Sequence, residues 1–351
     1  MAAESRRQDV PLAPLTTLGV GGNARWLVPW RDVAELRAGL AFAAAEGLPW
    51  WLLGGGSNVI IADAGLPGVV LQPAGTALRT VTADGQTRTV SADAGLGWDA
   101  LVAWSVAEGL GGIECLSGIP GLVGSAPIQN IGAYGQEVAE VITAVEVLDT
   151  RDGSARSFSA AECGFGYRDS VFKRAPGRWI ATRVSLCLRA AATPCRKYAQ
   201  VAEALPIPPP PGAIGLLQVR QTVLALRRAK GMVVDPADPD SRSVGSFFVN
   251  PIVAPAVAEA VRLRLAAGGA MPAWPVGDQL KLSAAWLIEH SGLRRGFGDG
   301  PVGLSAKHTL ALVNRGGATA ADVLAFAAQV VTHVEAASGV RLEREPVLLG
   351  F

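Results

Sequence analysis

The stretch Leu116–Gly135, LSGIPGLVGSAPIQNIGAYG, most constrains how this chain can fold, and we call it the central loop. Its glycines and prolines disfavour strand and helix, because glycine loses much backbone freedom on folding and proline removes a hydrogen-bond donor. Its aliphatic residues nevertheless predict burial, and buried backbone N–H groups need acceptors. A bound anion, such as the phosphate of a ligand, would supply those acceptors in a glycine-lined nest. A tight, glycine-rich crossover between sheets is the alternative interpretation.

A second glycine run, GGGSN at Gly54–Asn58, lies between short apolar segments at 50–53 and 59–61 that are expected as strands. Glycines here would let the backbone approach a diphosphate closely, and Ser57 and Asn58 would add side-chain donors. Taken alone, such a run is more often a plain tight turn. It therefore indicates a phosphate site only together with the central loop.

The segment Gly95–Ala100, GLGWDA, matches the GxGxxA pattern of dinucleotide-binding turns. That fingerprint also requires an acidic residue on the next strand, about 20 residues further on. Here the corresponding position falls at Gly111, Gly112 and the central loop, none of which is expected as a strand. We therefore expect no Rossmann-type site at this segment.

The chain has 351 residues, of which 50% are hydrophobic, and this predicts two or three domains with sizeable cores. A net charge of +1 implies no general attraction to nucleic acid or to a membrane surface. The four cysteines form no CxxC pair and no zinc-ligand spacing, so we expect free thiols, no metal and a reducing compartment. The N-terminal residues lack a signal-peptide pattern and no apolar run reaches about 20 residues, which favours a soluble, cytoplasmic protein.

Strand and helix patterns alternate over residues 20–190. The first helix has a capping box at its start and a glycine at its end, and the strands show apolar alternation bounded by turn residues. The predicted features are the capping box Asp32–Glu35, a helix stop at Gly47, a hairpin over 78–90 that turns at Asp84–Gly85, a strand over 141–148 that turns at Asp152–Gly153, a second capping pattern at Ser159–Glu162 and a strand over 179–188.

The proline-rich run from Pro206 to Pro211 is stiff and marks the clearest domain boundary. Beyond it, a helix over 214–230 ends in Arg227, Arg228 and Lys230, which we interpret as complementing the helix dipole. The other expected elements are strands over 245–251, 310–314 and 340–349, helices over 257–266 and 284–290, and a helix capped by Thr319 and Asp322 that runs to Gly339.

Several motifs resemble one enzyme family. Pro127–Gly135, PIQNIGAYG, resembles a pyrophosphate loop of vanillyl-alcohol-oxidase-like FAD-binding domains, and in particular that of the UDP-N-acetylenolpyruvoylglucosamine reductases of peptidoglycan synthesis. Tyr198 is similar to a tyrosine of the type I branch of this family. The other matching motifs are TLGVGGN at 17–23, GYRDSVFK at 166–173, GSFFVNP at 245–251 and LEREP at 342–346.

The resemblance implies a mixed α+β and α/β fold. It would combine a vanillyl-alcohol-oxidase-like FAD-binding domain of two subdomains with a smaller α/β substrate-binding domain. The expected parts are an N-terminal extension over 1–19, the FAD-binding domain over 20–190, a Tyr- and Pro-containing connection over 191–218, the substrate-binding domain over 219–339 and a C-terminal strand over 340–351.

The resemblance also implies non-covalent FAD as the cofactor and NADPH as the hydride donor. The family often has glutamate at the second position of the first glycine run, where this chain has Gly55, and the backbone role of that run is unaffected. The residues expected to bind FAD are Gly54, Gly55, Gly56, Ser57, Asn58, Ser117, Gly118, Ile119, Pro120, Gly124, Ser125, Gln129, Asn130, Gly132, Ala133 and Tyr134.

The implied reaction reduces the enolpyruvyl group of UDP-N-acetylglucosamine-enolpyruvate to UDP-N-acetylmuramate. Hydride addition beside a carboxylate builds negative charge on that carboxylate, and a permanently cationic Arg168 can stabilise this charge. Glu345 would be the second polarising group, and Ser246 would donate a proton to C2. Without the resemblance, Arg168 would be interpreted as an ion-pairing residue, Ser246 as a strand-end hydroxyl and Glu345, like Glu343, as a solvated carboxylate.

The resemblance further implies contacts between the UDP-sugar nucleotide and Tyr167, Tyr198, Lys230, Asn250 and Glu289. The chain departs from the family pattern in two places. The residues after Lys230 read GMVVDP, where the family has Leu-Pro-Asp-Pro. His290 stands where glutamine is common, so that Glu289 either replaces this contact or caps a helix end.

Two other functions fit parts of the sequence. A flavin oxidase or dehydrogenase on the same FAD-binding domain often binds FAD through a histidine, but the three histidines here lie at or beyond position 290. Cys115 would be an alternative anchor. A nucleotide-binding module without catalysis would lack the acid residues, yet Arg168, Ser246 and Glu345 are present. We expect a monomer that binds a small sugar nucleotide and neither nucleic acid nor a membrane.

Overall fold

The computed structural model describes residues 6–265 and 270–351. The chain divides into two compact units. Unit 1 comprises the described residues up to Val10, Ala24–Gly56 and Leu66–Arg228, and unit 2 comprises Pro11–Asn23, Ser57–Gly65 and Ala229–Phe351. Each unit buries its own hydrophobic core.

Unit 1 contains a four-stranded sheet in the order β1 (Arg7–Pro11), β2 (Asn23–Trp30), β5 (Leu66–Pro73) and β3 (Trp50–Leu52). β2, β5 and β3 run parallel, and the helix α1 (Val33–Ala45) is the crossover between β2 and β3 that parallel strands require. The carboxylate of Asp32 accepts the backbone N–H of Glu35, which confirms the predicted cap. Gly47 follows the helix with a φ of +62°, as expected of a helix stop.

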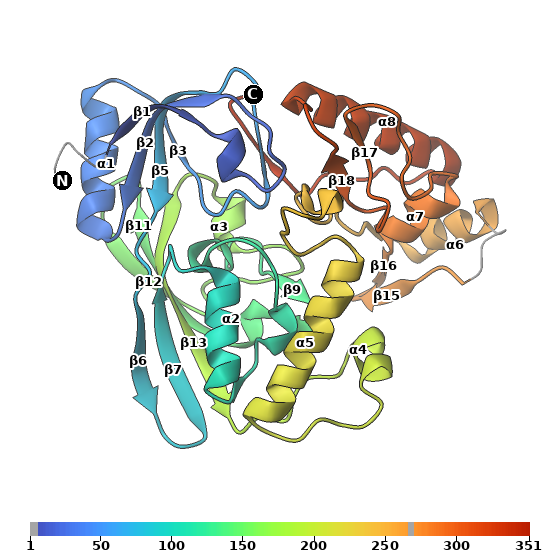
Figure 1. Ribbon diagram of the computed structural model, residues 1–351, viewed down its shortest axis with the longest axis horizontal. Coiled ribbons are helices and arrows are strands. Elements are labelled where there is room, and N and C mark those ends of the chain that lie inside the picture. Colours follow the sequence, from blue (N-terminus) through green and yellow to red (C-terminus); the bar gives the residue numbers. More distant parts are fainter. Residues whose placement is uncertain (1–5, 266–269) are drawn as a thin grey trace. The chain divides into compact units, whose positions relative to one another are not determined.

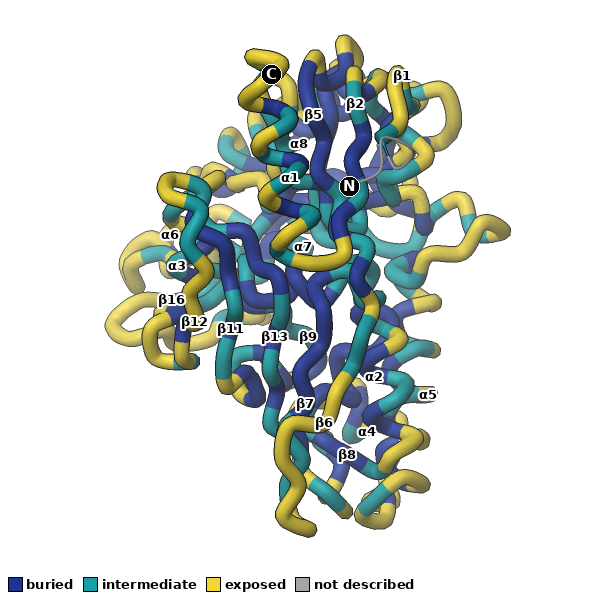
Figure 2. Tube along the Cα trace, turned by 90° about the vertical axis from the view of Figure 1, so that its left-hand side faces the viewer, coloured by how far each residue is buried: buried dark blue, intermediate teal, exposed yellow. Residues whose placement is uncertain are grey.

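Unit 1 also contains an antiparallel sheet in the order β12-β11-β13-β7-β6, with β8 paired to β13. The predicted hairpins are confirmed, with turns at Asp84–Gly85 and Asp152–Gly153. In Figure 2, β13 is dark blue and teal because alternate residues are buried, whereas β6 and its turn are yellow. The strands are β6 (Leu78–Ala83), β7 (Thr87–Asp93), β8 (Leu110–Gly111), β11 (Ile142–Asp149), β12 (Ala155–Ser159) and β13 (Trp179–Ala190).

Helices α2 and α5 lie side by side in unit 1 (Figure 1) and enclose the central loop together with the sheet. Gly215, Val219, Val223 and Arg227 recur at a spacing of four on α5 and are all buried. The remaining elements of unit 1 are α2 (Trp98–Ala107), β9 (Gly132–Ala133), β10 (Gln136–Glu137), α3 (Val171–Arg174), α4 (Ala199–Ala204) and α5 (Ala213–Ala229).

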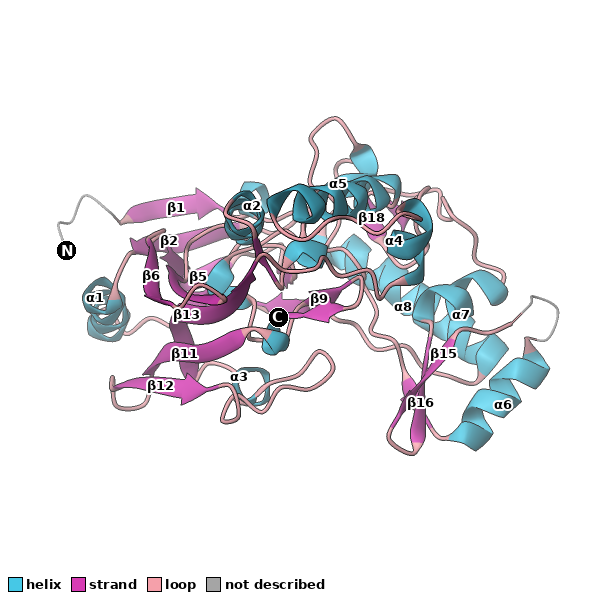
Figure 3. Cartoon of the chain, turned by 90° about the horizontal axis from the view of Figure 1, so that it is seen from below, coloured by secondary structure: helices cyan, strands magenta, loops and turns pink. Residues whose placement is uncertain are grey.

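In its described residues, unit 2 is built from short strands and α-helices that share one core (Figure 3). Residues far apart in sequence meet in it, since β4 and β19 pair in parallel and the Asn314 amide donates to the Leu18 carbonyl at 2.9 Å. The elements are β4 (Val59–Ile61), β14 (Ile252–Val253), α6 (Pro255–Arg264), β15 (Ala273–Val276), β16 (Gln279–Leu282), α7 (Ala284–His290), β17 (Val302–Leu304), β18 (Leu312–Asn314), α8 (Ala320–Ser338) and β19 (Val347–Leu349).

The helix α8 begins and ends as predicted. Thr319 and Asp322 form a capping box, and Gly339 ends the helix with a φ of +76°. Asp63 adds a second cap, since its carboxylate accepts the N–H groups of Ala320 and Ala321. Of the helices that the structure describes, α8 is long and apolar enough to cross a membrane, but its buried residues belong to the core of unit 2.

Two predicted strands are shorter in the structure. Gly245–Pro251 forms only an isolated bridge between Phe248 and Arg344, because Gly245 has a φ of +76° and Pro251 cannot donate a ladder hydrogen bond. The predicted strand over 340–349 is reduced to β19, since Pro346 interrupts it.

Two features predicted for helices also differ between the sequence analysis and the structure. Ser159 and Glu162 do bond to each other, but they close a single turn that ends at Gly164, whose φ is +53°. The helix expected over 257–266 is α6, which spans Pro255–Arg264, and the predicted end at residue 266 lies outside the described residues.

The two compact units do not follow the expected domain boundaries. Residues 57–65 group with unit 2 because β4 pairs with β19, and nearly all of α5 groups with unit 1. The boundaries at 19, 190, 218 and 339 remain predictions.

Candidate functional site

The central loop is hydrogen-bonded to residues 94–98, which overlap the segment Gly95–Ala100 that matches the GxGxxA pattern. Val123 donates its N–H to the carbonyl of Leu96 at 2.8 Å, and Gly124 donates to that of Ala94 at 3.0 Å. The Trp98 indole also donates to the Leu116 carbonyl at 3.1 Å. The segment around GLGWDA therefore supports the central loop through Ala94, Leu96 and Trp98.

The two glycine runs approach so closely that side chains would not fit. A Cβ on Gly54 would lie 2.5 Å from Ser125 Oγ, and one on Gly55 would lie 2.6 Å from the Cα of Gly121. Within the described residues, the backbone N–H groups of Gly54, Gly55 and Gly56 donate to no protein acceptor. A run of N–H groups without acceptors at a glycine-lined contact suits a phosphate or diphosphate. The residues present therefore fit the diphosphate of FAD.

Asn130 joins three segments around this loop. It is buried and has a φ of +45°, a conformation that asparagine tolerates better than most residues. Its amide donates to Glu137 Oε2 at 2.8 Å and to the Gly166 carbonyl at 3.0 Å, and its Oδ1 accepts the Ala139 N–H at 3.1 Å. These bonds engage both the amide nitrogen and the amide oxygen of the Asn130 side chain.

Arg168 is held at a tight turn and aimed at the central loop. Gly166 and Asp169 exchange both backbone hydrogen bonds, and Arg168 between them has a φ of +53°. Its guanidinium donates to the carbonyl oxygens of Asn130 at 3.3 Å and Gly132 at 2.8 Å. The strained backbone and the two bonds fix a permanent positive charge beside the loop.

Asp99 and Arg220 tie the loop to α5, and the sequence analysis did not identify either residue. The carboxylate of Asp99 accepts the Gly118 N–H at 2.6 Å and a bidentate pair from Arg220 at 2.6 and 2.8 Å. Burial raises the pKa of Asp99, but the hydrogen bonds from Arg220 and Gly118 outweigh it and leave that pKa below its usual value.

Arg227 corrects another interpretation. It does not simply complement the dipole of α5, because it is buried near Tyr134 and burial lowers the pKa of its guanidinium. Burial also raises the pKa of Tyr134 to about 12. Val219, Val223 and Arg227 follow one another at intervals of four residues, and this spacing could have revealed that Arg227 lies on the buried face of α5.

Two tyrosines of the predicted site meet in unit 1. The rings of Tyr134 and Tyr198 make an edge-to-face contact with centroids 5.2 Å apart. The Arg168 guanidinium lies 5.5 Å from the ring centre of Tyr167. Of the residues predicted to bind FAD, Ser57 and Asn58 lie in unit 2, and the others lie in unit 1.

In unit 2, the backbones that carry Ser246 and Glu345 are paired. Glu345 donates its N–H to the Phe247 carbonyl at 2.8 Å, and Val249 donates to the Glu343 carbonyl at 3.0 Å. Ser246 and Glu345 are half-buried, whereas Glu343 is exposed. The pairing therefore sets the backbones of Ser246 and Glu345 close together, and exposure distinguishes Glu345 from Glu343.

A second group in unit 2 gathers predicted substrate residues with His308. Burial, followed by the charges of Lys230 and Arg295, lowers the pKa of His308 to about 4. Glu289 accepts a hydrogen bond from the Thr309 hydroxyl at 3.1 Å and lies 3.7 Å from Arg295. His290, the residue at the glutamine position, stacks on Trp286 with centroids 3.8 Å apart. Asn250 instead accepts the N–H of Ala284 at the start of α7.

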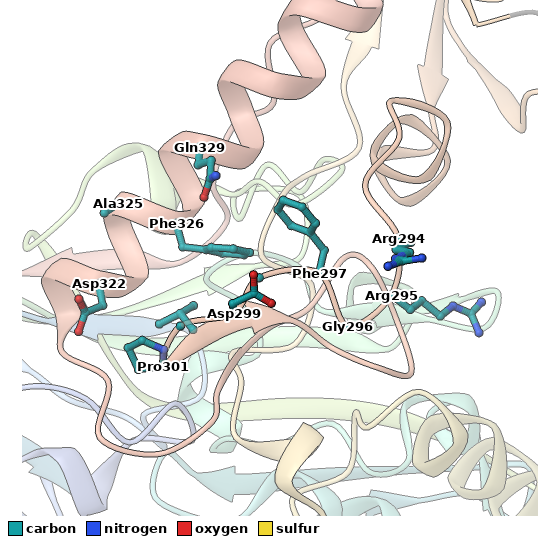
Figure 4. Close-up of a pocket in the computed structure, with 13 residues that line it drawn as sticks. Arg294, Arg295, Gly296, Phe297, Asp299, Pro301, Asp322, Ala325, Phe326 and Gln329 are labelled. Atoms are coloured by element: carbon teal, nitrogen blue, oxygen red, sulfur yellow. The ribbon is translucent and has the colours of Figure 1, made fainter.

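A cavity of about 960 Å³ in unit 2 contains none of the predicted site residues. Figure 4 shows Phe297 of the loop 294–302 and Phe326 of α8 turned toward one another, with Asp299 of the loop below them. Its wall is formed by the loop 294–302 and by Asp322, Ala325, Phe326 and Gln329 of α8. We assign no ligand to this cavity.

Comparison with known proteins first defines the class of protein. Residues 25–159 match the family model "FAD binding domain", which identifies a flavoprotein fold. Residues 236–349 match "UDP-N-acetylenolpyruvoylglucosamine reductase, C-terminal domain". The predicted fold class, an FAD-binding domain followed by a smaller α/β domain, is confirmed.

Full-length relatives then define the family. The UDP-N-acetylenolpyruvoylglucosamine reductase of Thermobifida fusca is 45% identical over 98% of both chains, and that of Streptomyces avermitilis is 47% identical over 97% of this chain and 94% of its own. The crystal structure of the reductase from Thermus caldophilus matches 98% of each chain with a TM-score of 0.65 and 29% identity. The chain belongs to the UDP-N-acetylenolpyruvoylglucosamine reductase family.

The half-buried His308 predicts a pH-dependent stability. Its folded pKa of about 4 lies below the ordinary value of 6.5, so between these values the unfolded chain binds a proton that the folded chain does not. Stability conferred by the neutral imidazole is complete above pH 6.5 and is lost as the pH falls to 4, by up to about 3 kcal/mol. His308→Gln should flatten this part of the curve in urea unfolding followed by circular dichroism.

The control is His333→Gln, which removes an imidazole bonded to the Ser291 carbonyl elsewhere in unit 2. The control should keep the wild-type slope between pH 6.5 and 4. Equal slopes for wild type and His308→Gln would contradict the assignment of a neutral His308 in the folded chain.

Proposed function

We propose that this chain is an FAD- and NADPH-dependent reductase that converts UDP-N-acetylglucosamine-enolpyruvate to UDP-N-acetylmuramate, a peptidoglycan precursor. The observation that carries the proposal is the Arg168 guanidinium, fixed on the carbonyl oxygens of Asn130 and Gly132 in the loop predicted to bind FAD. A permanent cation at this position can serve a substrate in which charge develops on a carboxylate.

The two glycine runs would hold FAD. In the part of the chain that the structure describes, the N–H groups of Gly54, Gly55 and Gly56 have no protein acceptor and suit the diphosphate, and the central loop supplies the facing surface. When bound, FAD accepts a hydride from NADPH and supplies one to the enolpyruvyl carbon. No histidine lies in unit 1, which favours non-covalent attachment.

Arg168 would stabilise the substrate carboxylate as it gains charge. The guanidinium presents a planar set of donors that matches a carboxylate, and it stays protonated at any working pH. Two of its bonds to backbone carbonyls preorganise it, so that little reorganisation is needed when charge develops. Glu345, whose segment pairs with that of Ser246, would be the second polarising group.

Ser246 would donate the proton that C2 needs after hydride addition. A hydroxyl is a weak acid, but a carbanion-like carbon is basic enough to take its proton. The pairing of residues 247–249 with 343–345 sets the backbone of Ser246 beside that of Glu345. Phe247 and Phe248 are buried and anchor this pairing in the core of unit 2.

We propose that the sugar nucleotide contacts Tyr167, Tyr198, Lys230, Asn250 and Glu289. The positive charges of Lys230 and Arg295 contribute to lowering the pKa of His308, and this concentration of positive charge supports an anion-binding region in unit 2. The Asn250 side chain is engaged by Ala284, so its contact with substrate has the weakest support. We also propose a cytoplasmic monomer; the four free cysteines support a reducing compartment.

Arg168→Lys should lower kcat by roughly 10²-fold, because a compact ammonium cannot make both carbonyl bonds and also meet a carboxylate bidentately. Lysine keeps the positive charge, so a lower kcat would show that the planar donor geometry of the guanidinium is required. The measurement is steady-state NADPH oxidation with the enolpyruvyl sugar nucleotide. Arg174→Lys, which alters the nearby ion pair with Asp169, is the matched control and should retain near-normal turnover. Full activity in Arg168→Lys would reduce Arg168 to a structural residue.

Ser246→Ala should separate the two half-reactions. NADPH does not need the Ser246 proton to reduce FAD, so flavin bleaching should keep its wild-type rate. Reoxidation by the enolpyruvyl sugar nucleotide should slow by about 10²–10⁴-fold, the usual contribution of general acid catalysis. Stopped-flow absorbance of the flavin measures the two steps individually, and Ser246→Cys should retain more of the second step because a thiol can donate.

The control is Ser243→Ala, which removes a structural hydroxyl bonded to the Gly245 N–H. It should lower thermal stability without selectively slowing reoxidation. Equal slowing of both half-reactions in Ser246→Ala would remove Ser246 from the proposed mechanism.

A further inference from the structure

Cys115 and Cys195 lie together although 79 residues separate them in the sequence. Cys115 Sγ donates to the carbonyl oxygen of Cys195 at 3.6 Å, and Cys195 Sγ lies 3.9 Å from the carbonyl oxygen of Gly135. Both cysteines pack in the cluster formed by Tyr134, Val219 and Val223. Both are free thiols.

A buried carboxylate holds the two cysteine backbones next to each other. Glu114, which precedes Cys115, is 1% exposed, and its Oε1 accepts the N–H of Cys195 at 2.9 Å. Its Oε2 accepts the Gly112 N–H at 2.7 Å. On the other side, the Cys115 N–H donates to the Gln136 side chain at 2.7 Å. The proximity of the cysteines is therefore fixed by three segments of unit 1, at residues 112–115, 136 and 195.

The two thiols differ in pKa and in burial, as expected of a pair in which one cysteine attacks an oxidant and the other then resolves the product to a disulfide. Hydrogen bonding between them raises the pKa of Cys115 and lowers that of Cys195 to about 7. Cys195 is half-buried and Cys115 is fully buried. The thiolate is the reactive form of cysteine, so Cys195 is the one that a small oxidant would reach and oxidise.

We propose that Cys115 and Cys195 form a two-cysteine oxidation site that reacts with peroxides. The Cys195 thiolate attacks one peroxide oxygen and breaks the O–O bond, which gives a sulfenic acid and, for hydrogen peroxide, hydroxide. The Cys115 sulfur then attacks the Cys195 sulfur, forms the disulfide and releases the sulfenic oxygen as water. The two thiols lose two electrons to the peroxide, and a dithiol reductant reverses the step.

The disulfide would fasten the segment of Tyr198 to the central loop. Tyr198 lies three residues after Cys195, and its ring already contacts Tyr134. A Cβ on Gly135 would lie 3.1 Å from the Cβ of Lys197, so this segment lies directly on the loop. Any effect on turnover rests on the proposed function, whereas the thiol chemistry does not.

The test treats the full-length protein, with its bound flavin, with hydrogen peroxide and counts thiols after unfolding. The count should fall from four to two, and peptide mass spectrometry should find residues 115 and 195 joined, with two hydrogen atoms lost. Cys163→Ser and Cys187→Ser are matched controls, and each should still lose two thiols. Burial raises the pKa of the Cys163 thiol to about 11, which disfavours its reactive thiolate.

Cys195→Ser should lose no pair of thiols, and this half-buried position tolerates serine better than the core does. In Cys115→Ser the sulfenic acid on Cys195 has no partner and should be trapped by dimedone. An unchanged thiol count in the wild type would overturn the proposal. A disulfide that joins Cys163 or Cys187, or one that links two chains, would also overturn it.

Discussion

The unit 1 part of the candidate site depends on the hydrogen bonds of the Asn130 side-chain amide. Its three hydrogen bonds connect the central loop to residues 137–139 and to the turn at Gly166. That turn carries Arg168, whose guanidinium returns to the carbonyl oxygen of Asn130. The loop and the cation thus fix each other, and both residues accept a positive φ to do so.

The close packing of the two glycine runs is the second constraint. Side chains at Gly54 and Gly55 would collide with Ser125 and Gly121, so only backbone lines this contact. Asp99 and Arg220 hold the loop from the side of α5. The fold therefore offers N–H groups of fixed direction and a cation of fixed position, which is what binding a diphosphate beside a charge-developing reaction requires.

The sequence allowed good predictions where the signal is local. The caps at Asp32 and Thr319 and the glycine turns at Gly85 and Gly153 follow from nearby residue types and appear as expected. Gly245–Pro251 and the segment before β19 were wrongly predicted as long strands, because proline and a positive φ interrupt the ladder. Asp99 and Arg220 were missed and Arg227 was misinterpreted as a partner of the helix dipole, since their roles come from residues about 20 to 120 positions away, although the spacing on α5 could have revealed Arg227. The three proposed catalytic residues depend on the family resemblance and stay predictions.

The measurement that tests the central claim most directly is anaerobic NADPH consumption by the purified yellow protein. The account predicts a low rate with NADPH alone and a sharp rise on adding the enolpyruvyl sugar nucleotide, with one UDP-N-acetylmuramate formed per NADPH oxidised. An NADPH oxidation that needs oxygen, produces hydrogen peroxide and ignores the sugar nucleotide would contradict it, and would identify a flavin oxidase on the same fold.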